Sequence, residues 1–324
     1  MNILKTVSNK KGFTMLELLW VIVIIGFLTA MIAPRLGGVS EKAEAKVNEA
    51  NLKDTKKCVE TFQQDFSGDL PDRLINLMLA DDDGIAGAAG DCVKPKVEDV
   101  TNDVMESISY DFNIRCLLTE HTLNGDEANE LQAMGINEVL SWNHPDDPDY
   151  DPATHFNRFD RVDVAAGVVV LMIGGGAADA TADITPDPGF DGLGEDIGNP
   201  EWLYRIVLGI GPDCGMVIEY YIEAAPLCPA GLDNRKYYYN YYSIVLPRLS
   251  ATLDRFGSLT FDDDDGDGYR DFDVIDRDDT ASGQIKRIRL KEMTASQFDI
   301  VNATGHGRQE DVKFWRLYDD GDGL

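Results

Sequence analysis

The chain has 324 residues, and its 58 aspartates and glutamates against 29 lysines and arginines give a net charge of −29 at pH 7. A surface this acidic repels phosphate backbones, so nucleic acid is not an expected partner, and it attracts divalent cations as counterions. The length is sufficient to bury a large hydrophobic core.

An apolar run of 21 residues, Phe13 to Ala33, follows the basic pair Lys10 and Lys11 near the N-terminus. This length and this basic flank are typical of a membrane-spanning helix. The run contains one ionisable side chain, Glu17, and a carboxylate in an apolar medium is costly unless it is paired. We therefore expect Glu17 to find a positively charged partner.

The sequence around this junction, Lys10-Lys11-Gly12-Phe13-Thr14-Met15-Leu16-Glu17-Leu18, resembles the type IV prepilin signal. The resemblance implies that residues 1–12 are a leader peptide, which prepilin peptidase removes after Gly12, and that Phe13 becomes the methylated N-terminus. It also implies that Glu17 recognises the N-terminus of a neighbouring subunit. The chain would then be added by an inner-membrane assembly platform to a homo-oligomeric helical filament.

Two other interpretations of this segment are weaker. The core of an ordinary secretory signal peptide should contain no carboxylate, and here Pro34 directly follows the small-residue site near Ala33. A simple membrane anchor explains the apolar length and the basic flank, but it explains neither the Gly12–Phe13 junction nor Glu17.

The pattern downstream predicts that the N-terminal helix continues to residue 66 and packs on a head. Charged helix-forming residues fill the stretch from Ser40 to Phe66, and Val59, Phe62 and Phe66 recur three and four residues apart on one face. Cys58 to Met78 resembles the end of the long helix in major pseudopilins of type II secretion. The expected fold class is therefore α+β and pilin-like: a helix over 13–66, transmembrane over 13–33, packed on an enlarged mixed α/β head over 67–324 with an antiparallel sheet.

The head, which carries almost all of the negative charge, is expected to mix strands with a short helix at Asp126 to Met134. Its size allows two lobes, divided near residues 179–200. Alternating or continuous apolar patterns predict strands at Ser107–Leu118, Val164–Ile173, Tyr204–Leu208, Met216–Glu223, Tyr237–Leu246, Ile285–Leu290 and Val312–Tyr318.

A calcium site is predicted where ten aspartates lie between Asp262 and Asp279. The spacing D-x-D-x-D-G-x-x-D resembles an EF-hand-type loop, in which short carboxylates wrap a hard cation and a glycine makes the turn. The expected ligands are Asp263, Asp265, Asp267 and Asp271. The twelfth position is Val274 instead of a bidentate glutamate, so the affinity should be modest, and a solvated acidic turn is the alternative.

All five cysteines follow the apolar run, on the side that this topology exports to an oxidising compartment. Cys214 with Cys228 is the preferred disulfide and Cys92 with Cys116 the second, which leaves Cys58 over. Sequence does not determine the pairing, and buried free thiols are the alternative.

Signals of catalysis are weak, so we expect no enzyme. Gly174-Gly175-Gly176 lacks the third glycine and the helix pattern of a dinucleotide loop. The four histidines show no metal-ligand spacing and are expected on the surface or in loops: His121, His144, His155 and His306.

Three functions are compared on this basis. The favoured one is a structural subunit of a type IV pilus-like or type II secretion pseudopilus filament. Such a subunit would have its helix in the inner membrane and its head in the periplasm before assembly, and would belong to an extracellular or periplasmic filament afterwards. The alternatives are a minor tip subunit or calcium-dependent adhesin, and a membrane-tethered enzyme.

Overall fold

The computed structural model describes residues 15–80, 92–93, 112, 116–142, 159–186, 200–228, 241–256, 270–275, 285–303, 305 and 307. The chain divides into two units, Met1–Val47 and Asn48–Leu324. Residues 13–33 were expected to cross a membrane. Within the described part of the chain, no helix has both the length and the apolarity that a membrane span requires.

Helix α1, Met15–Asp65, is a single element of 51 residues and confirms the predicted long N-terminal helix. Its second half is rich in alanine, glutamate and lysine, which have high helix propensity. In this half, Leu52, Thr55, Val59 and Phe62 are each at most 5% exposed. Their spacing of three and four residues places them on one helix face, which packs into the second unit.

Helix α1 ends because the backbone turns left-handed after it. Ser67 and Gly68 have φ values of 60° and 101°. The Gly68 amide donates to the carbonyl of Gln63 at 2.7 Å, which satisfies one of the last carbonyls of the helix.

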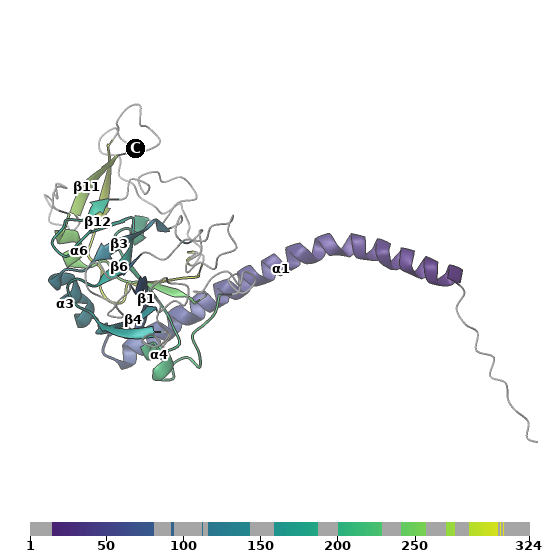
Figure 1. Ribbon diagram of the computed structural model, residues 1–324, viewed down its shortest axis with the longest axis horizontal. Helices are drawn as coiled ribbons and strands as arrows, with labels where there is room; N and C mark the ends of the chain where they lie inside the picture. The colour runs from purple at the N-terminus through teal and green to yellow at the C-terminus, as the bar shows by residue number, and fades with distance from the viewer. Residues whose placement is uncertain are drawn as a thin grey trace, which may run out of the picture. The chain divides into compact units, whose positions relative to one another are not determined.

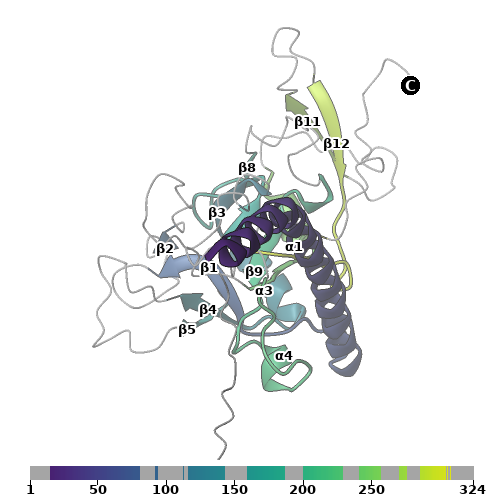
Figure 2. The ribbon, with the colours of Figure 1, turned by 90° about the vertical axis from the view of Figure 1, so that its right-hand side faces the viewer.

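A nine-stranded mixed sheet forms the centre of the second unit (Figures 1 and 2). Its main path runs β13-β10-β9-β1-β4-β5, with β2 on β1 and with β6 joining β3 to β9. The strands are β1 (Leu74–Ala80), β2 (Cys92–Val93), β3 (Leu118–Thr122), β4 (Glu138–Trp142), β5 (Phe159–Asp163), β6 (Val169–Ile173), β9 (Ile206–Gly209), β10 (Ser243–Val245) and β13 (Asp299–Val301).

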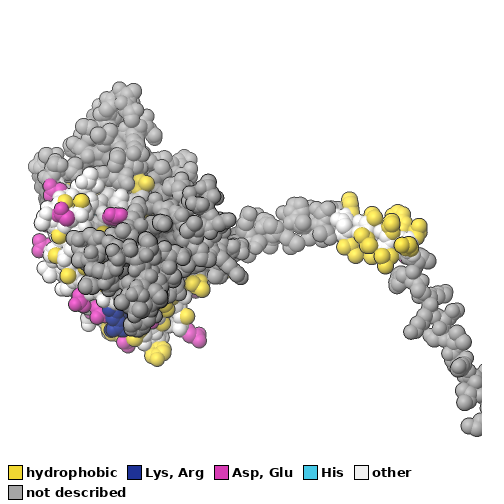
Figure 3. Space-filling view, in the orientation of Figure 1, with side chains coloured by type: hydrophobic (Ala, Val, Ile, Leu, Met, Phe, Trp, Pro, Cys, Tyr) yellow, Lys and Arg dark blue, Asp and Glu magenta, His cyan; other side chains and the backbone are white. Residues whose placement is uncertain are grey.

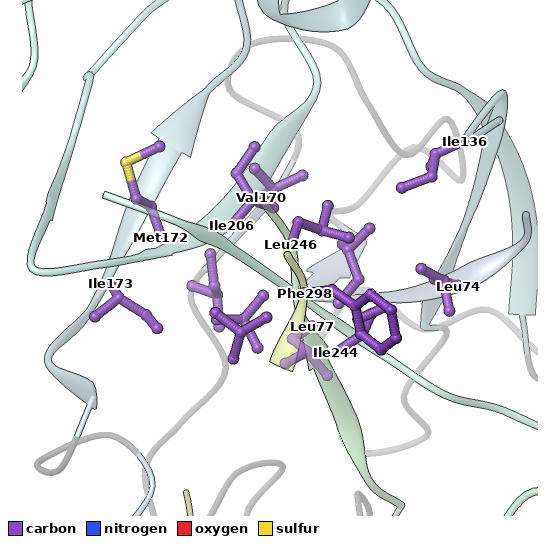
Figure 4. Close-up of a cluster of buried hydrophobic side chains, with 14 of the residues drawn as sticks. Leu74, Leu77, Ile136, Val170, Met172, Ile173, Ile206, Ile244, Leu246 and Phe298 are labelled. Carbon is purple, nitrogen blue, oxygen red and sulfur yellow. The ribbon is translucent and has the colours of Figure 1, made fainter. Parts of the chain in front are cut away.

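The pairs in this sheet are antiparallel except β1 with β4, which is parallel. Strand β6 is buried at every position, as its continuous apolar sequence predicts. Figure 4 shows side chains from β1, β6, β9 and β10 gathered with Ile136 and Phe298 in one apolar core.

Short elements surround the sheet. They are the helices α3 (Gly125–Ala133), α4 (Gly215–Ile218) and α6 (Ser250–Asp254), the 3-10 turn η1 (Pro200–Trp202), and the two-stranded ribbons β7 (Gly175–Gly176) with β8 (Thr185–Pro186) and β11 (Arg270–Ile275) with β12 (Ile285–Leu290). The β11–β12 ribbon stands apart from the main sheet in Figures 1 and 2.

Strands β6, β10 and β12 lie within predicted segments, and α3 and β9 overlap theirs but extend one residue outside, to Gly125 and to Gly209. The strand predicted at Met216–Glu223 is wrong, because α4 occupies its start. The Gly215 amide donates a hydrogen bond to the carbonyl of Asp72, in the loop before β1, and the Ile218 amide donates to the Cys214 carbonyl within the first helical turn. The backbone here therefore forms helix and loop hydrogen bonds instead of pairing with a neighbouring strand.

The strand predicted over 107–118 lies mostly outside the described residues. Of this segment, the structure describes Phe112 and residues 116–118. The backbone is helical at Phe112 and Cys116, and strand β3 begins at Leu118. The predicted strand at 312–318 also lies outside. The expected division near 179–200 does not separate two sheets, because β6 and β9, on either side of it, pair with each other.

We predict that Phe62→Ala destabilises the protein by about 3 kcal/mol or more, because it empties a well-packed site between α1 and the sheet unit. Gln64→Ala, at an exposed position two residues further along α1, is the control and should change stability little. Urea unfolding of the full-length protein in detergent measures both. Equal losses for the two variants would contradict the packing of α1 described above.

Candidate functional site

The N-terminal part of α1 carries an apolar surface that the chain itself leaves exposed. Eleven large hydrophobic side chains between Met15 and Phe27 are 48% to 92% exposed: Met15, Leu16, Leu18, Leu19, Trp20, Val21, Ile22, Val23, Ile24, Ile25 and Phe27. Figure 3 shows hydrophobic side chains across the visible face of this segment. Since consecutive residues point around the whole helix, the apolar surface encircles it, which is the pattern of a helix that is buried in lipid or among other helices.

Glu17 lies in the first turn of α1 and is exposed. A carboxylate at this end of a helix interacts favourably with the helix dipole and with a nearby cation. Gly12 and Phe13, the predicted processing site, lie outside the described residues.

The second unit contains a buried polar cluster formed by Glu127, His121, Arg255 and Thr252. Both oxygens of the Glu127 carboxylate are used: Oε1 accepts from His121 Nε2 at 2.9 Å and from Thr252 Oγ1 at 2.8 Å, and Oε2 accepts from Arg255. Glu127 is also the partner of Asn124 in a capping box that starts α3. One carboxylate therefore joins β3, α3 and α6.

The hydrogen bonds of His121 determine which ring nitrogen carries the proton. The Ala177 amide donates to Nδ1 at 3.0 Å, so Nδ1 is the acceptor and Nε2 donates to Glu127. Burial would raise the pKa of the Glu127 carboxyl, but the hydrogen bonds from His121 and Asn124 and the charge of Arg255 lower this pKa to about 2.

The expected surface position of His121 is wrong: the residue is fully buried in β3. The capping box Asn124-x-x-Glu127 was a usable sequence signal for Glu127, but nothing local indicated its long-range partner Arg255. Since the hydrogen-bonding groups are satisfied and closed to solvent, the cluster supports a structural role.

A second polar cluster fixes the end of α1 to the sheet. Asp299 in β13 accepts hydrogen bonds from Lys56 of α1, from Trp202 and from Arg205, each at 3.1 Å. Burial would raise the pKa of the Asp299 carboxyl, but the charges of Arg205 and Lys56 outweigh it and hold this pKa below its usual range. Sequence reasoning did not find this cluster, because its members are far apart in the chain.

The two predicted disulfides are not formed. Cys116, Cys214 and Cys228 are buried free thiols, and Cys58 is a partly exposed free thiol. Burial raises the pKa of Cys214 to about 11, which suppresses the thiolate that disulfide exchange requires. The alternative of buried free thiols is the one that the structure shows for these residues.

Of the predicted calcium ligands, Asp271 lies in β11, where its Cα is opposite that of Arg289 in β12. Asp263, Asp265 and Asp267 lie outside the described residues, so the structure does not test the calcium site.

The glycine run after β6 has a packing explanation. A side chain at Gly176 would place its Cβ 2.0 Å from the Glu120 carbonyl oxygen of β3, so only glycine fits there. The glycine at this position is therefore explained by the packing of β7 against β3.

Residues 7–33 match the family described as the prokaryotic N-terminal methylation motif. Over 111 residues, the chain is 30% identical to prepilin peptidase-dependent protein A of Clostridium perfringens (strain 13 / Type A), and this alignment covers 33% of the chain and 78% of that protein. No solved structure matches the chain significantly.

A long N-terminal helix with an exposed apolar surface, continued by an α+β unit and carrying this motif, defines a prepilin-type protein. The chain belongs to the type IV pilin-like family, which comprises structural substrates of prepilin peptidase and is not a family of enzymes.

We predict that Glu127→Gln flattens the acid part of the stability profile. Because the pKa of this carboxyl falls from 4.5 to about 2 on folding, the ionised group stabilises the protein above about pH 4.5 and loses that contribution as the pH falls toward 2. The contribution is on the order of 3 kcal/mol. The variant should therefore be less stable at pH 7 and lose less stability on acidification.

Urea unfolding at a series of pH values between about 2.5 and 7 gives both quantities. Asp126→Asn, at the exposed neighbouring acid in the same helix, is the matched control and should keep the slope of the unmodified protein. An unchanged slope in Glu127→Gln would show that Glu127 is not ionised in the buried cluster.

Proposed function

We propose that this protein is a structural subunit of a type IV pilus-like or type II secretion pseudopilus filament. In this proposal, prepilin peptidase cleaves the chain after Gly12, and the N-terminal helix holds the subunit at the inner membrane with its head in the periplasm. An assembly platform then adds it to a homo-oligomeric helical filament, which is periplasmic or extracellular.

The observation that carries this proposal is the apolar surface that encircles α1 between Met15 and Phe27. A surface of this kind must be covered by something outside the chain, and helices of further copies can surround it on all sides. The family motif over residues 7–33 contains the same segment and supports processing at its start.

Glu17 has a defined role in the proposal. It is the one carboxylate in the apolar run, and the amine that cleavage exposes at Phe13 is a cation of suitable reach in a neighbouring copy. Pairing the two groups brings opposite charges together in an apolar environment and sets the axial register of the helices.

A second candidate function is a minor tip subunit or adhesin with a filament-anchored head. It is favoured by the extent of the similarity: the alignment to the Clostridium protein covers 33% of this chain, so most of the head has no counterpart in that alignment. Many copies along a fibre would support the first function, and one copy at its end the second.

We further propose that calcium binds structurally at Asp263, Asp265, Asp267 and Asp271. The repulsion among ten aspartates between residues 262 and 279 is relieved by a divalent cation.

We predict that Glu17→Ala reduces filament yield by on the order of a hundredfold, since it leaves a buried amine without its partner. Glu49→Ala, which removes an exposed carboxylate from the same helix, is the control and should assemble normally. Sheared filaments are quantified by immunoblot and imaged by electron microscopy, and mass spectrometry of their N-terminus should find methylated Phe13. Assembled material that begins at Met1, or normal yield from Glu17→Ala, would defeat the proposal.

For calcium, we predict that a chelator lowers the melting temperature of the full-length protein by about 5 °C, the scale expected for a bound ligand at excess over its dissociation constant. Asp265→Ala with Asp267→Ala should abolish the difference between the two conditions. The control, Asp319→Ala with Asp320→Ala, removes the same charge from another acidic stretch and should retain it. An identical melting temperature with and without chelator in the unmodified protein would contradict the proposed calcium site.

A further inference from the structure

Exposed aromatic and apolar side chains occur at the end of α1 and in α4 with the turn that follows it, two segments that the contact between the Phe66 and Tyr221 rings brings together. Tyr220 is 90% exposed, and Phe66 and Ile218 are each 38% exposed. We call these three residues the aromatic patch. In Figure 3, hydrophobic and acidic side chains lie together at the lower edge of the second unit, where Figure 1 places α4.

The patch is held on a rigid base. The ring of Phe66 stacks on that of Phe62 with 4.2 Å between centroids, and Phe62 is itself buried in the core. The Tyr221 ring contacts both edge-on, and its hydroxyl donates to Asp65 at the end of α1. These contacts hold Phe66 at the end of α1 and fix the turn after α4 beside it.

Tyr220 follows the end of α4 with a φ of 61°, in the left-handed region that non-glycine residues rarely adopt. This conformation closes the helix: the Tyr220 amide donates to the Val217 carbonyl at 3.2 Å and the Tyr221 amide to the Met216 carbonyl at 2.9 Å, the hydrogen-bond pattern of a helix C-cap. The cap fixes the backbone at Tyr220 while its side chain remains 90% exposed.

Acidic residues are close to the aromatic patch in the sequence, since Asp65 precedes Phe66, Glu219 lies between Ile218 and Tyr220, and Glu223 follows three residues later; we call them its acidic rim. Asp65, Glu219 and Glu223 are exposed, and neither glutamate forms an ion pair with any residue that the structure describes. Aromatic faces and carboxylates together favour a cation with an apolar stem, which is the chemistry of a lysine or arginine side chain.

Such side chains are exposed on α1 itself. Lys53 and Lys57 lie one helical turn apart on exposed positions, and neither forms an ion pair within the described residues, whereas the neighbouring Lys56 is engaged by Asp299. In a chain of net charge −29, this pair of unengaged cations is the natural complement of an acidic rim.

We propose that the aromatic patch and its acidic rim dock the Lys53–Lys57 face of α1 in a second copy of this chain. The inference rests on the proposed function and deepens it by naming a head contact between subunits. The two surfaces are different parts of one molecule, so the contact is heterologous, and a heterologous contact that does not close into a ring generates an open helical polymer.

Charge reversal tests this contact in the full-length chain. Glu219→Lys with Glu223→Lys, and separately Lys53→Glu with Lys57→Glu, should each lower filament yield by at least about tenfold, because they place like charges opposite each other. Combining all four substitutions should restore the yield to within about twofold of normal, since the attraction is re-formed with its signs exchanged. Asp163→Lys with Asp183→Lys changes the net charge equally at exposed acids outside the patch and should leave the yield unchanged.

Photocrosslinking separates this contact from the filament proposal. A photoreactive benzoylphenylalanine at position 220 should give a dimeric adduct, with the crosslink in the partner peptide that contains Lys53 and Lys57. Three outcomes would contradict the docking but not the filament function, provided that the unmodified chain forms normal filaments. They are a crosslink that maps elsewhere, capture of a different protein, and no recovery of yield when all four charge reversals are combined. If the unmodified chain forms no filaments, the filament proposal fails, and the presence or absence of the mapped adduct in membranes still decides the docking.

Discussion

The structure depends on how the surface of one helix is covered. Between Met15 and Phe27, apolar side chains point in every direction, and a one-sided partner leaves most of them in water. Between Leu52 and Phe62 the same helix presents a single apolar face, and the sheet unit covers it. The two parts of the helix therefore have different requirements. The apolar surface of the first part is covered only by an environment that surrounds it, whereas the single apolar face of the second part is covered by the head. The family motif lies on the first part, where Glu17 is the one carboxylate in an otherwise apolar segment.

The second half of α1 is joined to the head by more than apolar contact. Lys56 reaches Asp299, which also holds Arg205, and the buried Arg205 guanidinium donates in addition to the carbonyls of Val245, Leu246 and Gln297. Removing one partner from such a group would leave a buried charge uncompensated, which is far more costly than losing a surface ion pair. The Tyr242 hydroxyl adds a hydrogen bond to Asn48 of α1 at 2.9 Å. These bonds join the second half of α1 to β13 and to the residue that precedes β10.

The sequence was sufficient wherever the determining signal was local. The long helix, the α3 segment with its capping glutamate and the continuous apolar strand β6 all follow from periodicity and composition. It was insufficient where distant residues decide the outcome. His121 looked like a surface or loop residue because Ala177, whose amide donates to its ring, is 56 positions away, and Cys214 looked like half of a disulfide because sequence shows neither its burial nor its free state. The run from Met216 to Glu223 was predicted as a strand from its composition, whereas α4 forms at its start, where the Gly215 amide donates a hydrogen bond to the distant Asp72 carbonyl. The N-terminal site was predictable as a motif, whereas the aromatic patch combines two segments that only the fold brings together.

The net charge of −29 sets a condition on any assembly of this chain. Residues 13–64 contain six basic and six acidic side chains, so the repulsion between copies comes almost entirely from the rest of the chain. At physiological ionic strength, exposed charges farther apart than about 8 Å are largely screened, and the contacts at shorter range decide whether two copies attract or repel. A polymer of acidic heads therefore requires that each carboxylate at an interface meets a cation. In the proposed filament, the lysines of α1 would supply such cations, and the proposed calcium would neutralise acidic stretches that face no lysine. Docking through Lys53 and Lys57 would thus explain how a strongly acidic head tolerates close neighbours, because the acidic rim of one copy is covered by the least acidic part of the next.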